Sequence, residues 1–177
     1  MKIKHISSIF VGVITFFILV FLDQMIKRLA VLRLKNQDPV ILIKNVFQLF
    51  YLENHGAAFG ILQGKRFFFL IITVIIILVL AYCYVRVPYT KKFRILRVVF
   101  VMLAAGAIGN FIDRIAQGYV VDFFYFNLID FPIFNVADIY VTCSAILLAV
   151  LIIFRYKEAD ITELTNSLKI TKKRERN

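Results

Sequence analysis

The sequence predicts a polytopic α-helical membrane protein with four transmembrane helices and a small β-rich segment on one side of the bilayer. Three observations lead to this fold class. Hydrophobic residues make up 61% of the 177 residues, and the mean hydropathy is +0.82, both far above an ordinary soluble domain. The third observation is a set of four uncharged apolar runs, at Ile6–Leu22, Phe67–Val85, Val98–Ile112 and Ile139–Phe154.

Each run is close to the length that crosses a bilayer as a helix. The runs contain 17, 19, 15 and 16 residues, against about 20 for a typical span. The two shortest are bounded by Asp113 and Asp138, so we expect their outer turns at the headgroups or shielded by protein. Lys2 and Lys4 precede the first run, as in a secretory signal, but no small-residue cleavage site follows. We therefore expect this run to be a retained first span.

Basic residues collect on one side of the predicted membrane. Of the 22 Lys and Arg residues, 14 lie before the first span, in the loop between spans two and three, or after the fourth span. The positive-inside rule therefore predicts that both termini are cytoplasmic. Topology and attraction to anionic lipid explain the net charge of +11, so nucleic acid is not an expected partner.

A single transmembrane domain is expected over residues 1–156, followed by a basic cytoplasmic tail over residues 157–177. The tail begins with Ile161, Leu164 and Leu168 at helical spacing, which predicts a short surface helix. Two outer segments remain, at about residues 25–66 and 113–137. Everything chemically unusual in the chain then lies toward one face of the membrane.

The first outer segment contains the stretch VILIKNVFQLFYLE, which is rich in β-branched and aromatic residues and bounded by turn residues. This composition predicts one or two short strands lying on the membrane surface. The stretch GAAFGILQG at 56–64 follows, with glycines that give a flexible backbone. In the third span, the small residues of AAGAIGN predict close packing between helices.

Elimination narrows the chemistry that the outer face can perform. The two histidines, His5 and His55, lie in no metal-binding pattern, so a metal site is not expected. No serine on the outer side has a Lys or His base beside it, which makes a serine nucleophile improbable. The polar groups that remain toward the outer face are Asp23 with Lys27, Asn54, Asn110 with Asp113 and Arg114, Asp122, and Asn135 with Asp138.

Most of these groups also have a purely structural explanation. Asp23 and Lys27 are four residues apart and can form a simple ion pair on one helical face. Asn135 and Asp138 have the spacing of a helix N-cap and an acidic first-turn residue. Arg114 could serve to anchor its span at the headgroups.

Asp122 is the exception, because it has no basic neighbour in sequence and no helix end to cap. It stands within GYVVDFFYF, which contains no other charge, and an ionisable group at membrane depth points to function. If the chain folds back so that Asp122 meets Asp138, the two carboxylates share one proton. An aspartic peptidase requires this arrangement: the ionised member activates water, and the protonated member hydrogen-bonds the scissile carbonyl. The apolar neighbours of Asp122 would raise the affinity for the shared proton.

Five motifs occur between residues 21 and 138, in the order FLDQMIK, NHGAAFG, GAIGNFIDR, GYVVDF and FPIFNVAD. Together they resemble the bacterial lipoprotein signal peptidases, also called signal peptidase II. The resemblance implies that Asp122 and Asp138 form the catalytic dyad. It also implies a supporting or substrate-binding role for Asp23, Lys27, Asn54, Gly56, Asn110, Asp113, Arg114 and Asn135.

The resemblance further implies the activity and its setting. The expected enzyme is a membrane aspartic endopeptidase that cuts a prolipoprotein immediately before the cysteine that carries diacylglycerol. It is expected to work without metal or organic cofactor and to be inhibited by the cyclic peptide globomycin. We expect a monomer in contact with membrane lipids, placed in the bacterial cytoplasmic membrane with its active site toward the outer leaflet.

Two other readings of the sequence remain open at this point. The chain could be a small proton- or ion-coupled transporter or channel subunit, with Asp23, Asp113, Asp122 and Asp138 as a proton relay. Transporters often show repeated halves and midplane binding sites, whereas these carboxylates gather at one face and no repeat is visible. An assembly scaffold would explain the small-residue packing but would leave Asp122 without a reason.

Overall fold

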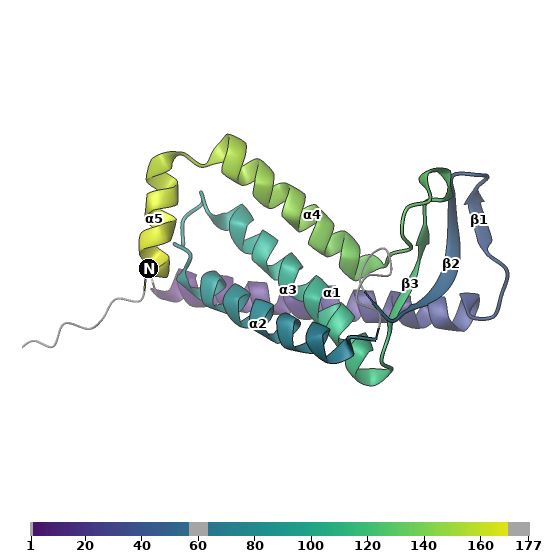
Figure 1. The fold of residues 1–177 in the computed structure, drawn as a ribbon. Helices are drawn as coiled ribbons and strands as arrows, with labels where there is room; N and C mark the ends of the chain where they lie inside the picture. The colour runs from purple at the N-terminus through teal and green to yellow at the C-terminus, as the bar shows by residue number, and fades with distance from the viewer. Residues whose placement is uncertain (1, 57–63, 170–177) are drawn as a thin grey trace, which may run out of the picture.

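The structure of the chain is a computed structural model, and it describes residues 2–56 and 64–169. Most of the GAAFGILQG stretch and the last residues of the basic tail lie outside the described part. Figure 1 shows long helices running side by side, with a small sheet at one end of the bundle. The start of the chain and the last helix lie at the opposite end (Figure 1).

The long helices are α1 (Lys2–Leu34), α2 (Arg66–Arg86), α3 (Arg94–Ala116) and α4 (Val136–Val150). A π-helical turn at Leu151–Arg155 continues α4, and α5 follows at Glu158–Leu168. Helices α1, α2 and α3, and α4 together with its π-helical turn, are each long and apolar enough to cross a membrane. The four-span prediction and the short helix expected in the tail are both confirmed. Helix α3 packs against α1, α2 and α4, so it forms the centre of the bundle.

The two outer segments expected from the sequence begin inside helices and not in loops. Helix α1 continues past residue 25 to Leu34, and α3 continues through Asp113 to Ala116. The reason is electrostatic, because Asp23 pairs with Lys27 one turn further along α1. Asp113 pairs with the same lysine from α3. Neutralised charges of this kind can stay inside a helix that enters the membrane.

The sheet has three antiparallel strands in the order β1 (Val40–Ile43), β2 (Phe47–Asn54) and β3 (Val120–Tyr125). The first two strands confirm the prediction for the first outer segment. The third strand was not predicted, and it contains Asp122, which pairs in register with Leu52 of β2. Residues 120–123 are all buried, so the strand lacks the alternation of polar and apolar residues that would have identified it.

The small residues of α3 allow neighbouring backbones to approach closely, as the sequence predicted. A Cβ atom on Gly106 would meet the carbonyl of Ala137, and one on Gly109 would overlap the carboxylate of Asp23. A buried apolar cluster lies beneath the sheet and is formed by Ala30, Leu34, Val121, Phe123 and Val136. This packing fixes β3 against α1 and the start of α4 and therefore positions Asp122.

Candidate active site

Asp122 is held in β3 with both carboxylate oxygens bonded. Its side chain is 1% exposed. Asn54 Nδ2 donates to one oxygen at 2.7 Å, and Asn135 Nδ2 donates to the other at 2.6 Å. Burial, and secondly the charge of Asp138, raise the pKa of Asp122 to about 7. The apolar surroundings expected from the sequence are present, since Val121 and other neighbours are buried.

Asp138 lies in the first turn of α4 and forms a capping box with Asn135. The Asn135 side chain accepts from the Asp138 backbone N–H at 3.1 Å, and Asp138 Oδ2 accepts from the Asn135 backbone N–H at 3.1 Å. The other carboxylate oxygen accepts from Asn110 Nδ2 at 2.8 Å. The predicted cap is confirmed.

The two aspartates line one cavity of about 540 Å³, which is within the usual range for ligand sites. Asn135 joins them directly, because its side chain bonds Asp122 and its backbone bonds Asp138. Other polar groups of the lining are Asn54, Asn110 and Arg114. The remaining wall consists of Val120, Phe131, Pro132, Ile133 and Phe134 near the sheet, and Ile139, Val141, Thr142 and Cys143 on α4.

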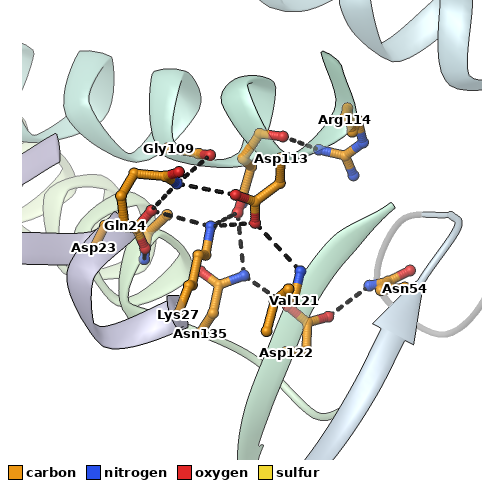
Figure 2. Close-up of polar contacts among 12 residues, drawn as sticks. Asp23, Gln24, Lys27, Asn54, Gly109, Asp113, Arg114, Val121, Asp122 and Asn135 are labelled. Atoms are coloured by element: carbon orange, nitrogen blue, oxygen red, sulfur yellow. Dashed lines mark hydrogen bonds and ion pairs between the residues drawn. The ribbon is translucent and has the colours of Figure 1, made fainter. Parts of the chain in front are cut away.

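Lys27 is the centre of a buried ionic cluster behind the aspartates (Figure 2). Its Nζ atom lies 3.0 Å from Asp23 Oδ2 and 2.9 Å from Asp113 Oδ2. It also donates to Asn110 Oδ1 at 2.9 Å, and Asn110 in turn bonds Asp138. The interpretation of Lys27 as a simple ion pair with Asp23 is therefore incomplete. A lysine with two carboxylates and an amide as partners can order several elements at once.

Both carboxylates of this cluster also hold the backbone beside the two aspartates. Asp23 Oδ1 accepts from the N–H of Ala137 at 2.9 Å, one residue before Asp138. Asp113 Oδ2 accepts from the N–H of Val121 at 3.2 Å, one residue before Asp122. Figure 2 shows the second of these bonds entering β3. The cluster therefore ties α1 and α3 to β3 and to the first turn of α4.

Arg114 faces the cavity, which rules against a role limited to anchoring at the headgroups. Its Nη2 donates to the carbonyl of Gly56 at 2.9 Å, and its guanidinium lies 4.6 Å from the centre of the Phe69 ring. Gly56 N–H donates to Asn54 Oδ1 at 2.9 Å. Arg114 and Asn54 therefore fix the chain at Gly56, next to the bonds that hold Asp122.

The structure brings every site residue expected from the sequence into this one connected region. Gln24 belongs to it as well and was missed, although a polar side chain beside Asp23 in an otherwise apolar span is a recognisable signal. His55 is exposed and contacts the Tyr119 ring. Among residues 2–56 and 64–169, no group of three or more His, Cys, Asp or Glu side chains could hold a metal ion.

The four apolar helices and one cavity that holds two aspartates, Asp122 buried and Asp138 half-buried, are the features expected of the class of membrane aspartic peptidases. A family model described as "Signal peptidase (SPase) II" matches residues 15–154. The chain belongs to the signal peptidase II family, and it is a multi-pass bacterial membrane protein. The transporter and scaffold alternatives find no support in this match.

Named relatives agree with the family model. The chain is 45% identical over 137 residues to a "Lipoprotein signal peptidase" of Caldanaerobacter subterraneus subsp. tengcongensis, covering 77% of this chain and 91% of the relative. It is 42% identical to a protein of the same name from Clostridium tetani, covering 76% of this chain and 86% of the relative. A solved bacterial membrane enzyme is similar with a TM-score of 0.73 and 37% identity, covering 86% of this chain and 92% of that one.

Proposed function

We propose that Asp122 and Asp138 are the catalytic dyad with which this signal peptidase II removes signal peptides from prolipoproteins. The observation that carries the proposal is the joint placement of the two carboxylates in one cavity, with Asn135 bonded to both. The two carboxylates have different surroundings, and a pair that works as acid and base requires such a difference. Asp122 is buried with a pKa raised to about 7, whereas Asp138 accepts two hydrogen bonds at a helix N-terminus.

These surroundings assign the roles in the reaction. Asp122 carries the proton at rest and donates it as a hydrogen bond to the oxygen of the scissile carbonyl. The Asp138 carboxylate acts as the general base and takes a proton from water, whose oxygen attacks the carbonyl carbon. The tetrahedral intermediate then breaks at the C–N bond, and a proton from the dyad passes to the leaving amine. The peptide is cut without a covalent intermediate.

The cavity walls favour a lipid-modified substrate. Polar groups surround the dyad, while Ile139, Val141 and Cys143 continue the wall along α4 toward the membrane interior. A diacylglyceryl group on the substrate cysteine would lie against this apolar wall, which places the peptide bond just before that cysteine at the dyad. We infer cleavage at this bond, consistent with relatives named lipoprotein signal peptidases.

The charge pattern supports the orientation of the enzyme in the membrane. Of the 18 Lys and Arg residues in the described ranges, ten belong to the starts of α1 and α3, the end of α2, the connections beside them and the segment from Arg155 onward. These parts lie at the end of the bundle opposite the sheet (Figure 1), and that end is expected in the cytoplasm. The dyad then lies at the outer leaflet, where water reaches the headgroup level. The chain acts as a monomer in this proposal, because one copy supplies both carboxylates and the whole cavity.

The test compares lipidated and non-lipidated precursors incubated with the purified enzyme in detergent. Cleavage of the lipidated precursor alone, at the bond before the cysteine, is the expected result. Asp122→Asn and Asp138→Asn should each abolish cleavage. The matched control is Asp130→Asn, since Asp130 is exposed and its carboxylate accepts a hydrogen bond from Tyr125 Oη, away from the dyad. Substantial turnover by either dyad variant would contradict the proposal.

Globomycin offers a second test that does not depend on turnover. A cyclic peptide that resembles a blocked substrate should occupy the dyad cavity and protect Cys143, which lines it, from alkylation. The distant Cys83 should react equally with and without the inhibitor. Equal protection of both thiols, or of neither, would show that the inhibitor binds elsewhere.

A further inference from the structure

Gln24 occupies a position in which only a hydrogen-bond donor fits. Its Nε2 atom lies 2.9 Å from Asp113 Oδ1, 3.1 Å from Asp23 Oδ2 and 3.1 Å from the carbonyl oxygen of Gly109. All three partners are acceptors, so the amide nitrogen must face them and the amide oxygen would be repelled. Figure 2 shows the carboxamide between Asp23 and Asp113, on the side away from β3.

The two carboxylates that Gln24 contacts hold the backbone at both proposed catalytic residues. Asp113 divides its oxygens between two tasks: Oδ2 meets Lys27 and the N–H of Val121, and Oδ1 meets Gln24. Gln24 therefore fixes the rotation of the Asp113 carboxylate, and with it the bond to β3. Asp23 also divides its oxygens between two tasks. Its Oδ1 accepts from the N–H of Ala137, and its Oδ2 contacts Lys27 Nζ and Gln24 Nε2.

Charge explains why this donor is a neutral amide. Two buried carboxylates share one lysine, so the cluster of Asp23, Asp113 and Lys27 carries a net negative charge. An amide supplies hydrogen bonds to both carboxylates without adding charge. Two N–H groups serve three acceptors, so one of them is shared.

We propose that Gln24 is a positioning residue of the peptidase, which sets the separation of Asp122 and Asp138 through the carboxylates of Asp113 and Asp23. The inference rests on the proposed function of the dyad. Gln24 does not line the cavity, so it acts on the rate of the chemical step and leaves substrate binding unchanged.

The first experiment is the variant Gln24→Met, which keeps the length of the side chain and removes its donors. We expect kcat for a lipidated precursor to fall roughly ten- to hundred-fold, as small displacements of catalytic groups do, with KM unchanged within about two-fold. Gln37→Met is the matched control, since Gln37 is exposed in the turn after α1, and its kcat should equal that of the native enzyme. A normal kcat for Gln24→Met, or a change confined to KM, would overturn the inference.

The second experiment is Gln24→Glu, which supplies a donor only while the new carboxyl is protonated. The ionisable groups facing this position are Asp23 and Lys27 on α1, Asp113 on α3, and Tyr140 of α4, which interacts with Asp23. Because an ionised Glu would be repelled by two carboxylates, the activity of this variant relative to the native enzyme should fall as the pH rises. The same ratio for Gln24→Met should not change with pH. A constant ratio for Gln24→Glu would overturn the inference.

Separate control experiments test whether the Gln24 variants fold and whether the proposed dyad is correct. Circular dichroism and size-exclusion profiles should match the native enzyme, and a Gln24 variant that does not fold counts against a positioning role. Asp122→Asn is assayed in parallel. If that variant is inactive and Gln24→Met is normal, the Gln24 inference alone fails. If Asp122→Asn is active, the proposed dyad fails, and a pH-dependent effect of Gln24→Glu then belongs to a different site.

Discussion

Replacing Asp122 by Asn should make the protein more stable at alkaline pH and less stable at acid pH. The carboxyl group of Asp122 has a pKa of about 7 in the folded chain and an ordinary value of 3.8. A raised folded pKa stabilises the protonated fold, so this contribution is complete below pH 3.8 and is lost as the pH rises to about 7. Each pKa unit is worth about 1.36 kcal/mol, which makes the full loss about 4 kcal/mol.

The amide of an asparagine cannot ionise, so Asp122→Asn escapes this loss but gives up a hydrogen bond. Asn54 and Asn135 both donate to Asp122, and an asparagine there offers an oxygen to only one of them. The unmatched contact costs about 1–2 kcal/mol at every pH. The variant should therefore be less stable than the native protein at pH 4 and about 2–3 kcal/mol more stable at pH 8.

The assay is thermal unfolding in detergent at constant ionic strength, followed by far-ultraviolet circular dichroism. This signal suits a helical protein without tryptophan. The midpoints of the two proteins should cross between pH 4 and pH 8, while the exposed control Asp130→Asn should give no such crossing. Parallel curves for Asp122→Asn would refute the reasoning, because they would mean that Asp122 is ionised throughout this range. In the native enzyme, kcat should fall above pH 7 as the dyad loses its proton.

Three further predictions concern the surroundings of the dyad. Lys27→Met leaves two buried carboxylates without their cation and should cost about 3–5 kcal/mol of unfolding free energy; an unchanged melting midpoint would contradict the cluster. Gly109→Ala places a methyl group against the Asp23 carboxylate and should cost about 1–3 kcal/mol, measured in the same melts. In a Cys83→Ser variant, N-ethylmaleimide can alkylate only Cys143 among the two cysteines. This alkylation should lower kcat/KM for a lipidated precursor. Full activity after complete labelling would exclude Cys143 from the substrate path.

The sequence could predict features that depend on local spacing. Four apolar runs gave the four helices, and the β-branched stretch after α1 gave β1 and β2. The cap at Asn135 and Asp138, three residues apart, was also readable. The placement of Asp122 and Asp138 on one cavity agrees with the expectation drawn from the apolar setting of Asp122 and from the resemblance of the motifs, and their catalytic role stays a prediction.

Features that depend on distant contacts could not be read from one sequence. Strand β3 is buried over most of its length and carries no alternation, so only its pairing with β2 identifies it. Asp23 lies one helical turn from Lys27, so an ion pair within α1 was enough to explain Lys27 from the sequence. Its contacts with Asp113 and Asn110 cross to α3 and depend on how the helices pack. The position of Gln24 beside Asp23 was a readable signal, but its contacts with Asp113 and Gly109 also cross to α3 and could not be read.

The shared lysine has a consequence for biogenesis. Before the helices assemble, Asp23 and Lys27 balance each other within one turn of α1, while Asp113 is followed directly by Arg114 on α3. The acidic residue that each of these two helices carries toward the sheet end therefore has a basic residue nearby in sequence before assembly. When α3 docks, Asp113 joins Lys27, and Arg114 turns to Gly56. The contact between Asp113 and Lys27 joins two different spans, so this part of the site forms only after both spans are inserted and α3 has packed against α1.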